Sequence, residues 1–368
     1  MYKRQPEFSG EWENCQIANI LSIGSGRDYK HLEKGNIPVF GTGGYMTSVN
    51  ECIYDGETTF IGRKGSINKP FYYNGKFWTV DTLFYTHSFN KTTPKFVYCL
   101  FQTINWLRYN EASGVPSLSK DTIEKIKVFI PQLDEQRKIS EMLSVIDERI
   151  ATQNKIIEKL QSLIRGLSDN IHRDIKGETV CFSGVGEAYS GLSGKSGDDF
   201  GDGEPFITYM NVYQNTYISE KDYEFVQIAP NERQNCVQYG DALFTLSSET
   251  PEEVGIGAVY LGNTQKLYLN SFCFGIHFYD ERVLPQYLAH FISSFSFRKA
   301  IYPLAQGSTR FNLQKNDFMK MKFVLPTLEE QERIAKTLDA LHYCMANEKS
   351  LLEQYILLKR YLLSQMFI

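Results

Sequence analysis

Six short stretches of the chain combine glycine or hydroxyl residues with side chains that can donate hydrogen bonds to an anion or to a polar edge. They lie at residues 25–30, 41–50 and 62–70 in the first half of the chain and at 193–197, 245–250 and 307–312 in the second. Glycine lets the backbone approach a phosphate closely, and Arg, Lys, Ser, Thr and Asn supply donors to phosphates and base edges. These residue types therefore suit contacts with nucleic acid.

The candidate contacts follow directly from these stretches. In the first half they are Arg27, Lys30, Gly43, Tyr45, Arg63, Lys64, Ser66, Asn68 and Lys69, and in the second Lys195, Ser247, Ser248, Ser308, Thr309, Arg310 and Asn312. Arg63 and Lys64, between two glycines, are the strongest candidates, and Lys195 and Arg310 are their expected counterparts. Taken singly, any one of these residues is better explained as an ordinary loop residue, because loops are rich in Gly, Ser and Lys. The recurrence of basic glycine-rich loops in both halves favours a shared binding task.

No motif for catalysis accompanies these loops. The stretch GLSGKSG at 191–197 is similar to a phosphate-binding loop, but Tyr189 stands where that pattern requires glycine, and we expect no apolar strand before it. An enzyme that hydrolyses nucleotides is therefore the least favoured alternative, and we expect no catalytic residue. The seven cysteines are scattered without a CxxC pair or a Cys/His cluster, which argues against disulfides and a metal site.

The composition is that of an ordinary globular protein. The 368 residues are 42% hydrophobic and 22% charged, without a long apolar run or a signal pattern, so we expect a cytoplasmic protein with no membrane partner. The formal net charge of −4 is unevenly spread, because residues 1–132 carry 15 basic and 12 acidic side chains and residues 177–327 carry 11 and 17. A nucleic-acid binder of this charge must focus its basic groups on one face or rely on a basic partner.

The chain contains an internal repeat at an offset of 195 residues. The sequence IPQLDEQRKI at 130–139 matches LPTLEEQERI at 325–334, and the similarity continues downstream as far as the match of Leu167 with Leu362. A weaker match upstream has an offset near 167, with SIGSGR (22–27) facing SGLSGK (190–195) and Pro38 facing Pro205. We interpret the chain as a tandem duplication in which the first part of each copy diverged.

A long helix is expected after each copy of the motif. Pro131 and Pro326 end a short strand-like run, acidic residues follow, and apolar residues then recur every three or four positions. The predicted seam consists of Leu143, Ile146, Ile150, Gln153, Ile157 and Leu160 in the first helix and Leu338, Leu341, Met345, Glu348, Leu352 and Tyr355 in the second. One polar residue interrupts each seam at the equivalent place, a pattern that fixes register. We expect an antiparallel coiled coil; two amphipathic helices, each docked on its own globule, are the alternative.

The regions before the helices indicate globules built of many short strands. They are rich in Gly, Tyr, Phe, Thr and Asn, and helical patches occur only late in each, at 94–110 and 285–301. The predicted fold class is α+β, with two α/β globules and two long helices in a tandem, pseudo-twofold arrangement. The predicted boundaries are 1–132 for the first globule, 133–176 for the central helix, 177–327 for the second globule and 328–368 for the C-terminal helix.

A divergent globule, an [IL]P-x-L-x-EQ-x-x-I motif and a heptad helix, twice in one chain, resemble the specificity subunit of Type I restriction–modification systems. GTGGY, FIGRKGSI and WTVDTLFY in the first half, and GSTRFNLQKNDF in the second, resemble elements of that family's target-recognition domains. The resemblance covers essentially the whole chain, and the duplicated motif is specific.

The resemblance implies that each globule is a target-recognition domain that reads one half of a bipartite, asymmetric site in double-stranded DNA. The paired helices would space the two domains and dock two methyltransferase subunits, which restriction subunits would join. Catalysis, S-adenosylmethionine, ATP and Mg²⁺ would belong to those partners, and this chain would carry no cofactor or metal. A coiled-coil scaffold whose globules bind protein instead of DNA is the alternative.

Overall fold

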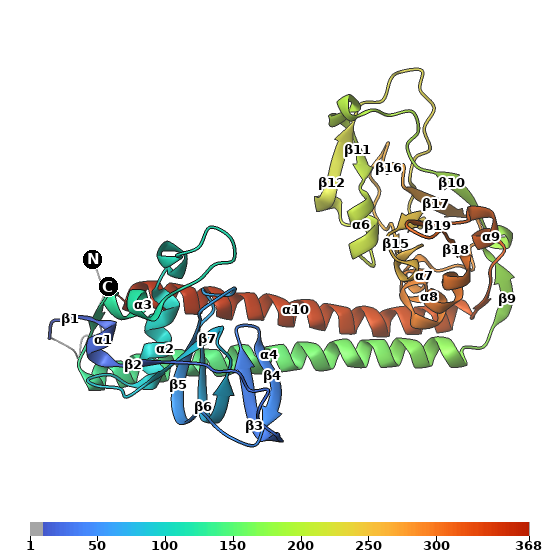
Figure 1. Ribbon diagram of the computed structural model, residues 1–368. Helices are drawn as coiled ribbons and strands as arrows, with labels where there is room; N and C mark the ends of the chain where they lie inside the picture. Colours follow the sequence, from blue (N-terminus) through green and yellow to red (C-terminus); the bar gives the residue numbers. More distant parts are fainter. Residues whose placement is uncertain (1–9, 368) are drawn as a thin grey trace. The chain divides into compact units, whose positions relative to one another are not determined.

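The computed structural model describes residues 10–367, and the chain divides into two compact units. Unit 1 comprises Met1–Lys155 with Lys349–Ile368, and unit 2 comprises Ile156–Glu348. Each unit holds one mixed α/β domain and one part of each of two long helices (Figure 1). This architecture of two domains and two long helices confirms the predicted fold class.

The domain of unit 1, called domain 1, is built around one six-stranded sheet. Its elements are β1 (Glu13–Gln16), α1 (Ile17–Ile20), β2 (Ser22–Ser25), β3 (Lys34–Gly41), β4 (Gly44–Val49), β5 (Tyr54–Gly62), β6 (Phe71–Thr79), β7 (Leu83–His87), α2 (Pro94–Thr103), the 3-10 helix η1 (Trp106–Tyr109), α3 (Lys120–Lys125) and β8 (Lys127–Ile130). The sheet order is β2-β7-β5-β6-β3-β4. Helix α2 begins where the Thr93 side chain accepts a hydrogen bond from Phe96 N and Pro94 opens the first turn.

The domain of unit 2, called domain 2, divides its strands among smaller sheets. Its elements are β9 (Glu178–Cys181), α5 (Phe182–Val185), β10 (Gly186–Ser190), η2 (Gly197–Asp199), β11 (Phe200–Ile207), α6 (Tyr209–Gln214), η3 (Glu220–Asp222), β12 (Tyr223–Val226), β13 (Ala242–Thr245), β14 (Ser247–Ser248), η4 (Pro251–Glu253), β15 (Gly257–Val259), β16 (Tyr268–Leu269), β17 (Cys273–Phe278), α7 (Pro285–Ser293), α8 (Phe295–Ile301), η5 (Tyr302–Leu304), β18 (Ala305–Gln306), β19 (Phe311–Leu313), α9 (Lys315–Met319) and β20 (Lys322–Leu325). The sheet orders are β10-β17-β13-β15, β12-β11-β16 and β14-β19-β18. Phe182, Phe244 and Phe318 are fully buried at the centre of the core.

The two domains begin and end in the same way, which agrees with a tandem duplication. In domain 1, β1 pairs antiparallel with β8, so Glu13 faces Ile130. In domain 2, β9 pairs antiparallel with β20, so Glu178 faces Leu325. The runs before Pro131 and Pro326 are therefore strands, as predicted, and each closes its domain just before a long helix begins.

The long helices are α4 (Leu133–Asp174) and α10 (Leu328–Met366). In unit 1, the buried Leu143 of α4 belongs to a core on which Leu362 and Met366 of α10 pack. In unit 2, Leu167 of α4 packs on the core that contains Leu338 of α10. Because the first part of α4 lies with the last part of α10 and the reverse holds in unit 2, the helices are antiparallel. None of the predicted seam positions is exposed.

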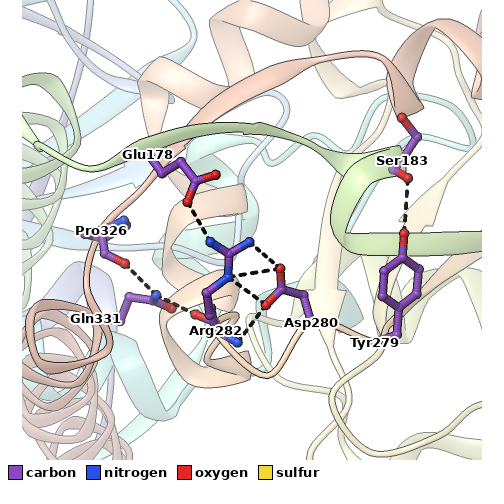
Figure 2. Close-up of polar contacts among 7 residues, drawn as sticks. All are labelled: Glu178, Ser183, Tyr279, Asp280, Arg282, Pro326 and Gln331. Atoms are coloured by element: carbon purple, nitrogen blue, oxygen red, sulfur yellow. Dashed lines mark hydrogen bonds and ion pairs between the residues drawn. The ribbon is translucent and has the colours of Figure 1, made fainter.

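One buried glutamine fixes the start of each long helix to its domain. Gln331 Nε2 donates to Arg282 O at 2.7 Å and to Pro326 O at 2.9 Å (Figure 2). Its Oε1 accepts from Leu284 N at 2.9 Å. Gln136 does the same in domain 1, where its amide bonds to Lys91 O, Pro131 O, Thr93 N and the Thr92 hydroxyl. Both glutamines are fully buried. The repeated glutamine of the motif thus has a structural cause.

The Arg282 side chain reinforces this junction in domain 2. Its guanidinium donates to Glu178 Oε2 at 2.6 Å and to Asp280 Oδ2 at 2.7 Å, while its carbonyl accepts from Gln331 (Figure 2). Arg282 therefore ties the first strand of the domain to the first turn of α10, which positions the helix on the domain.

Candidate nucleic-acid interface

The basic glycine-rich loops of domain 1 meet at a short turn, residues 79–82, between β6 and β7. Three separate segments are tied to this turn by backbone hydrogen bonds. The bonds run from Arg27 N to Thr79 O (2.8 Å), from Val80 N to Phe40 O (3.1 Å) and from Arg63 N to Thr82 O (2.8 Å). The 79–82 turn therefore brings together stretches that lie far apart in the sequence.

Domain 2 has the same arrangement around the turn at residues 269–272, between β16 and β17. The bonds run from Leu192 N to Leu269 O (2.7 Å), from Asn270 N to Ile207 O (2.9 Å) and from Leu246 N to Phe272 O (2.8 Å). Since the same three segments are tied at the same three places, the 79–82 and 269–272 turns occupy equivalent positions in the two domains.

This equivalence corrects part of the repeat alignment. A Cβ on Gly26 would lie 1.9 Å from Val80 O, and a Cβ on Gly191 would lie 2.1 Å from Asn270 O, so both turns require glycine at the same place. Gly26 therefore matches Gly191, and the predicted facing of 22–27 with 190–195 was wrong by three residues. The predicted match of Pro38 with Pro205 agrees with the equivalence of Phe40 and Ile207.

The expected counterparts of Arg63 and Lys64 do not lie at the equivalent backbone positions of domain 2. Leu118 N donates to Arg63 O at 2.9 Å, and Leu313 N donates to Leu246 O at 2.8 Å, so Leu246 occupies the place of Arg63. Ser247, the next residue, occupies the place of Lys64. Neither Lys195 nor Arg310 is equivalent to them, because the two domains differ in loop length and a match of residue types alone could not fix the register.

A basic concavity of about 310 Å³ lies beside the 79–82 turn. It is lined by Ser25, Arg63, Lys64, Phe84, Glu111, Ser117, Leu118, Ser119 and Lys120. The Arg63 guanidinium is 5.8 Å from the centre of the Phe84 ring, and its Nη1 is 3.4 Å from Asp81 O, which orients the side chain. Hydrogen bonds from Thr122 and Ser119 lower the pKa of Glu111 and keep it ionised. The lining therefore carries three cationic side chains and one carboxylate.

The other candidate residues of domain 1 lie on loops near this concavity or on the hairpin next to it. Tyr45 is 64% exposed at the tip of the β3–β4 hairpin, where Gly44 adopts a positive φ of 101° that the turn requires. Ser66, Asn68 and Lys69 are exposed on either side of the buried Ile67. The remaining exposed candidates are Arg27, Lys30 and Gly43.

An equally large concavity of about 310 Å³ lies beside the 269–272 turn, but its lining is aromatic and acidic. The lining residues are Tyr209, Met210, Tyr213, Ser247, Ser248, Glu249, Glu253, Phe272 and Arg310. The Arg310 guanidinium is 5.7 Å from the centre of the Phe272 ring. Glu253 accepts hydrogen bonds from Tyr213 at 2.8 Å and from Ser248 at 3.0 Å, and these bonds lower its pKa below the usual range.

Lys195 does not face this concavity. Its ammonium group donates to Glu232 Oε2 at 2.5 Å and to Gln227 O at 2.6 Å, and its side chain is 8% exposed. The hydrogen bond from Lys195 lowers the pKa of Glu232 to about 2. Strand β10 does precede the 191–197 stretch, but a lysine committed to a carboxylate is not available to a phosphate.

The remaining candidates of domain 2 lie on the hairpin formed by β18 and β19. Ser308 and Thr309 are exposed in its turn, directly before Arg310. Asn312 pairs with Ser247 across β14 and β19, at the place where Lys64 bridges to Ser117 in domain 1. This hairpin therefore forms one edge of the acidic concavity.

The sequence did not indicate the aromatic part of either concavity. Tyr209 and Tyr213 are four residues apart, which places both rings on one face of α6, and their ring centres are 6.0 Å apart. That spacing was a usable signal. Phe272, Lys120 and Glu111 lie far from the glycine-rich stretches in sequence, and only the fold brings them to the concavities.

Neither a metal site nor a membrane segment is found in the part of the chain that the structure describes. Within residues 10–367, no three His, Cys, Asp or Glu side chains are grouped so that they could hold a metal ion. No helix in the same range has the length and apolar character needed to cross a membrane.

The family model described as the Type I restriction modification DNA specificity domain matches residues 9–162 and 178–355. The chain therefore belongs to this family and is a Type I restriction–modification DNA specificity subunit. The family supplies specificity and carries neither a catalytic centre nor a cofactor of its own.

Similar proteins and structures agree with this assignment. The chain is 22% identical to the putative type I restriction enzyme specificity subunit S.HindORF215P of Haemophilus influenzae, over 89% of this chain and 86% of that protein. It is 24% identical to the type I restriction enzyme MjaVIII specificity subunit of Methanocaldococcus jannaschii, over 66% of this chain and 62% of that protein. The fold resembles the crystal structure of a Type I S subunit from M. genitalium, with a TM-score of 0.64, 13% identity and coverage of 100% and 99% of the two chains.

Proposed function

We propose that each domain reads one half of a bipartite, asymmetric target in double-stranded DNA. The first target-recognition domain would be residues 1–132 and the second residues 177–327, with residues 133–176 and 328–368 as the helices between and after them. The observation that carries this proposal is the equivalence of the 79–82 and 269–272 turns, each of which gathers the same loops beside a concavity of the same size. Two equivalent binding faces in one chain suit a target with two unlike halves.

The proposed DNA contacts differ in strength between the domains. Arg63 and Lys64 are the principal contacts in domain 1, because they project from a loop that backbone hydrogen bonds hold in place. Tyr45 and Arg27 flank them on neighbouring loops. In domain 2 the contacts centre on Arg310 and Ser247, and we leave Lys195 out because its charge is already paired.

We propose that partner subunits supply all chemistry. Two methyltransferase subunits would dock along α4 and α10, and restriction subunits would join that assembly in the cytoplasm. S-adenosylmethionine, ATP and Mg²⁺ would be bound by those partners. Sharing DNA contacts with basic partners would also compensate for the acidic character of domain 2, because affinity for DNA depends on the total number of neutralised phosphates.

A double substitution tests DNA binding by domain 1. In the complex of the full chain with its methyltransferase subunit, Arg63→Ala with Lys64→Ala should weaken DNA binding, because two cationic contacts are lost. The slope of log affinity against log salt should fall by about 2 if both side chains contact phosphates. Fluorescence anisotropy with duplex DNA at several salt concentrations measures both quantities.

The matched control removes the same charge elsewhere in domain 1. Lys125 and Lys127 are exposed on α3 and β8, outside the concavity, so replacing both with alanine should leave the salt slope nearly unchanged. Size-exclusion chromatography should show intact complexes for both variants. Equal DNA binding by wild type and the Arg63/Lys64 variant would support the scaffold alternative instead.

A further inference from the structure

The two equivalent concavities carry opposite charge. In domain 1, Arg63, Lys64 and Lys120 outnumber the single carboxylate of Glu111. In domain 2, Arg310 is outnumbered by Glu249 and Glu253. A phosphate is attracted to the first lining and repelled by the second, because like charges at close range disfavour binding. The two concavities therefore suit different parts of a DNA duplex.

The floor of the domain 2 concavity contains an unsatisfied hydroxyl group. Ser247 is 5% exposed and lines the concavity, and its Oγ has no hydrogen-bond partner among the described residues. Buried hydroxyl groups are normally hydrogen-bonded, so Ser247 Oγ is a polar group beside the concavity whose hydrogen-bonding capacity the described residues leave unused. In domain 1 the same place is taken by the exposed Lys64.

The walls of this concavity present flat, apolar faces. The rings of Tyr209 and Tyr213 are stacked at an interplanar angle of 18°, and Phe272 is 55% exposed beneath the Arg310 guanidinium. Apolar side chains and guanidinium groups can also contact base edges in a groove of duplex DNA. Glu249 is exposed at the rim, where a carboxylate can accept a hydrogen bond from a base amino group.

We propose that the domain 2 concavity binds the edge of a nucleobase that carries an exocyclic amino group, whereas the equivalent concavity of domain 1 binds a backbone phosphate. Glu249 accepts from the amino group, Arg310 donates to a neighbouring acceptor, and Ser247 completes the contact. Glu249 and Arg310 are thus specificity-determining residues of domain 2, and Lys64 is a positioning contact in domain 1. This inference rests on the proposed function.

The test compares base discrimination with salt dependence. The motif is first identified by mapping methylated sites made by the wild-type complex, and duplexes with each base pair of the motif replaced are then titrated with variant complexes. Glu249→Gln should reduce discrimination at one base pair by about tenfold, since a good base contact contributes roughly 1–3 kcal/mol. Its salt slope should not fall. Lys64→Ala should weaken binding to all duplexes alike and lower the slope by about 1.

Glu252→Gln is the matched control, because Glu252 is an exposed carboxylate nearby that does not line the concavity. It should leave discrimination unchanged at every position. Discrimination by Glu249→Gln that equals the wild type, or an equal gain of affinity for all duplexes, would overturn the inference while the proposed function stands. A wild-type complex that yields no bipartite motif would contradict the proposed function itself.

Discussion

Domain 1 and domain 2 share a backbone arrangement but differ in the side chains that it presents. The 79–82 and 269–272 turns make the same three backbone hydrogen bonds, yet Arg63 is replaced by Leu246 and Lys64 by Ser247. This difference indicates that the two domains share a scaffold of backbone hydrogen bonds and close glycine contacts. The side chains above that scaffold are free to vary, because the backbone bonds hold the loops regardless of side-chain type.

The junctions between domains and helices show the opposite behaviour, because there the side chain itself is retained. Gln136 and Gln331 bond backbone groups of their domains, so their replacement removes these hydrogen bonds. Scaffold positions that depend on a side chain are therefore constrained, whereas those that depend on the backbone tolerate divergence. The predictions below test this contrast.

The largest expected effect is on stability at the two junctions. Gln136→Leu and Gln331→Leu should each lower the free energy of unfolding by about 3 kcal/mol, because each leaves buried backbone donors and acceptors unsatisfied. Replacing Gln136 should lower the free energy of unfolding slightly more than replacing Gln331, since Gln136 also bonds the Thr92 hydroxyl. Chemical denaturation measures both. Gln132→Leu, at an exposed position, is the control, and an equal loss there would refute the role of the buried amide.

A smaller effect separates two lysines that the sequence could not distinguish. Lys64→Met should lower DNA affinity about tenfold, the value of one charge-assisted contact of roughly 1.5 kcal/mol, without lowering the melting temperature. Lys195→Met should lower the melting temperature and leave DNA affinity unchanged, because it removes the partner of Glu232. Anisotropy and thermal melts on both variants check this. The opposite result, in which Lys195→Met lowers DNA affinity and Lys64→Met lowers the melting temperature, would indicate that Lys195 contacts DNA.

The smallest expected effect is a difference in acid sensitivity. Burial lowers the pKa of His172 and of His290 in unit 2, so the folded chain takes up protons at these groups less readily than the unfolded chain. The unfolded chain takes up protons below the ordinary histidine pKa of 6.5, so stability should decrease as pH falls below about 6.5, by at most about 1.4 kcal/mol per pH unit for each group.

Hydrogen exchange at pH 7.5 and 5.5 measures this sensitivity within each unit. His172→Phe should reduce it, and a phenylalanine fits beside Tyr287 and Phe291. Protection of unit 2 that weakens in His172→Phe as much as in the wild type would contradict an origin in this histidine.

The sequence predicted the large elements of the fold better than the alignment of the two domains. The strands before Pro131 and Pro326, the two long helices and their antiparallel pairing followed from a repeat and from apolar periodicity, which are local signals. The sequence did not predict the register between the diverged halves. Gly26 and Gly191 are equivalent because each packs closely against the backbone of a turn, and residue type alone does not reveal that contact. Arg63 and Lys64 were proposed from their flanking glycines, and both line the concavity of domain 1, whereas Tyr213 and Phe272 meet only through the fold.

Mapping the methylated sites of genomic DNA tests the central claim most directly. The chain is co-expressed with its methyltransferase subunit, and modified bases are located by single-molecule sequencing. The account predicts one bipartite motif with a fixed gap, and it predicts that Glu249→Gln relaxes a base pair in only one of its halves. Methylation at a continuous motif, at no defined motif, or with both halves relaxed by that single substitution would contradict two domains that read separate half-sites.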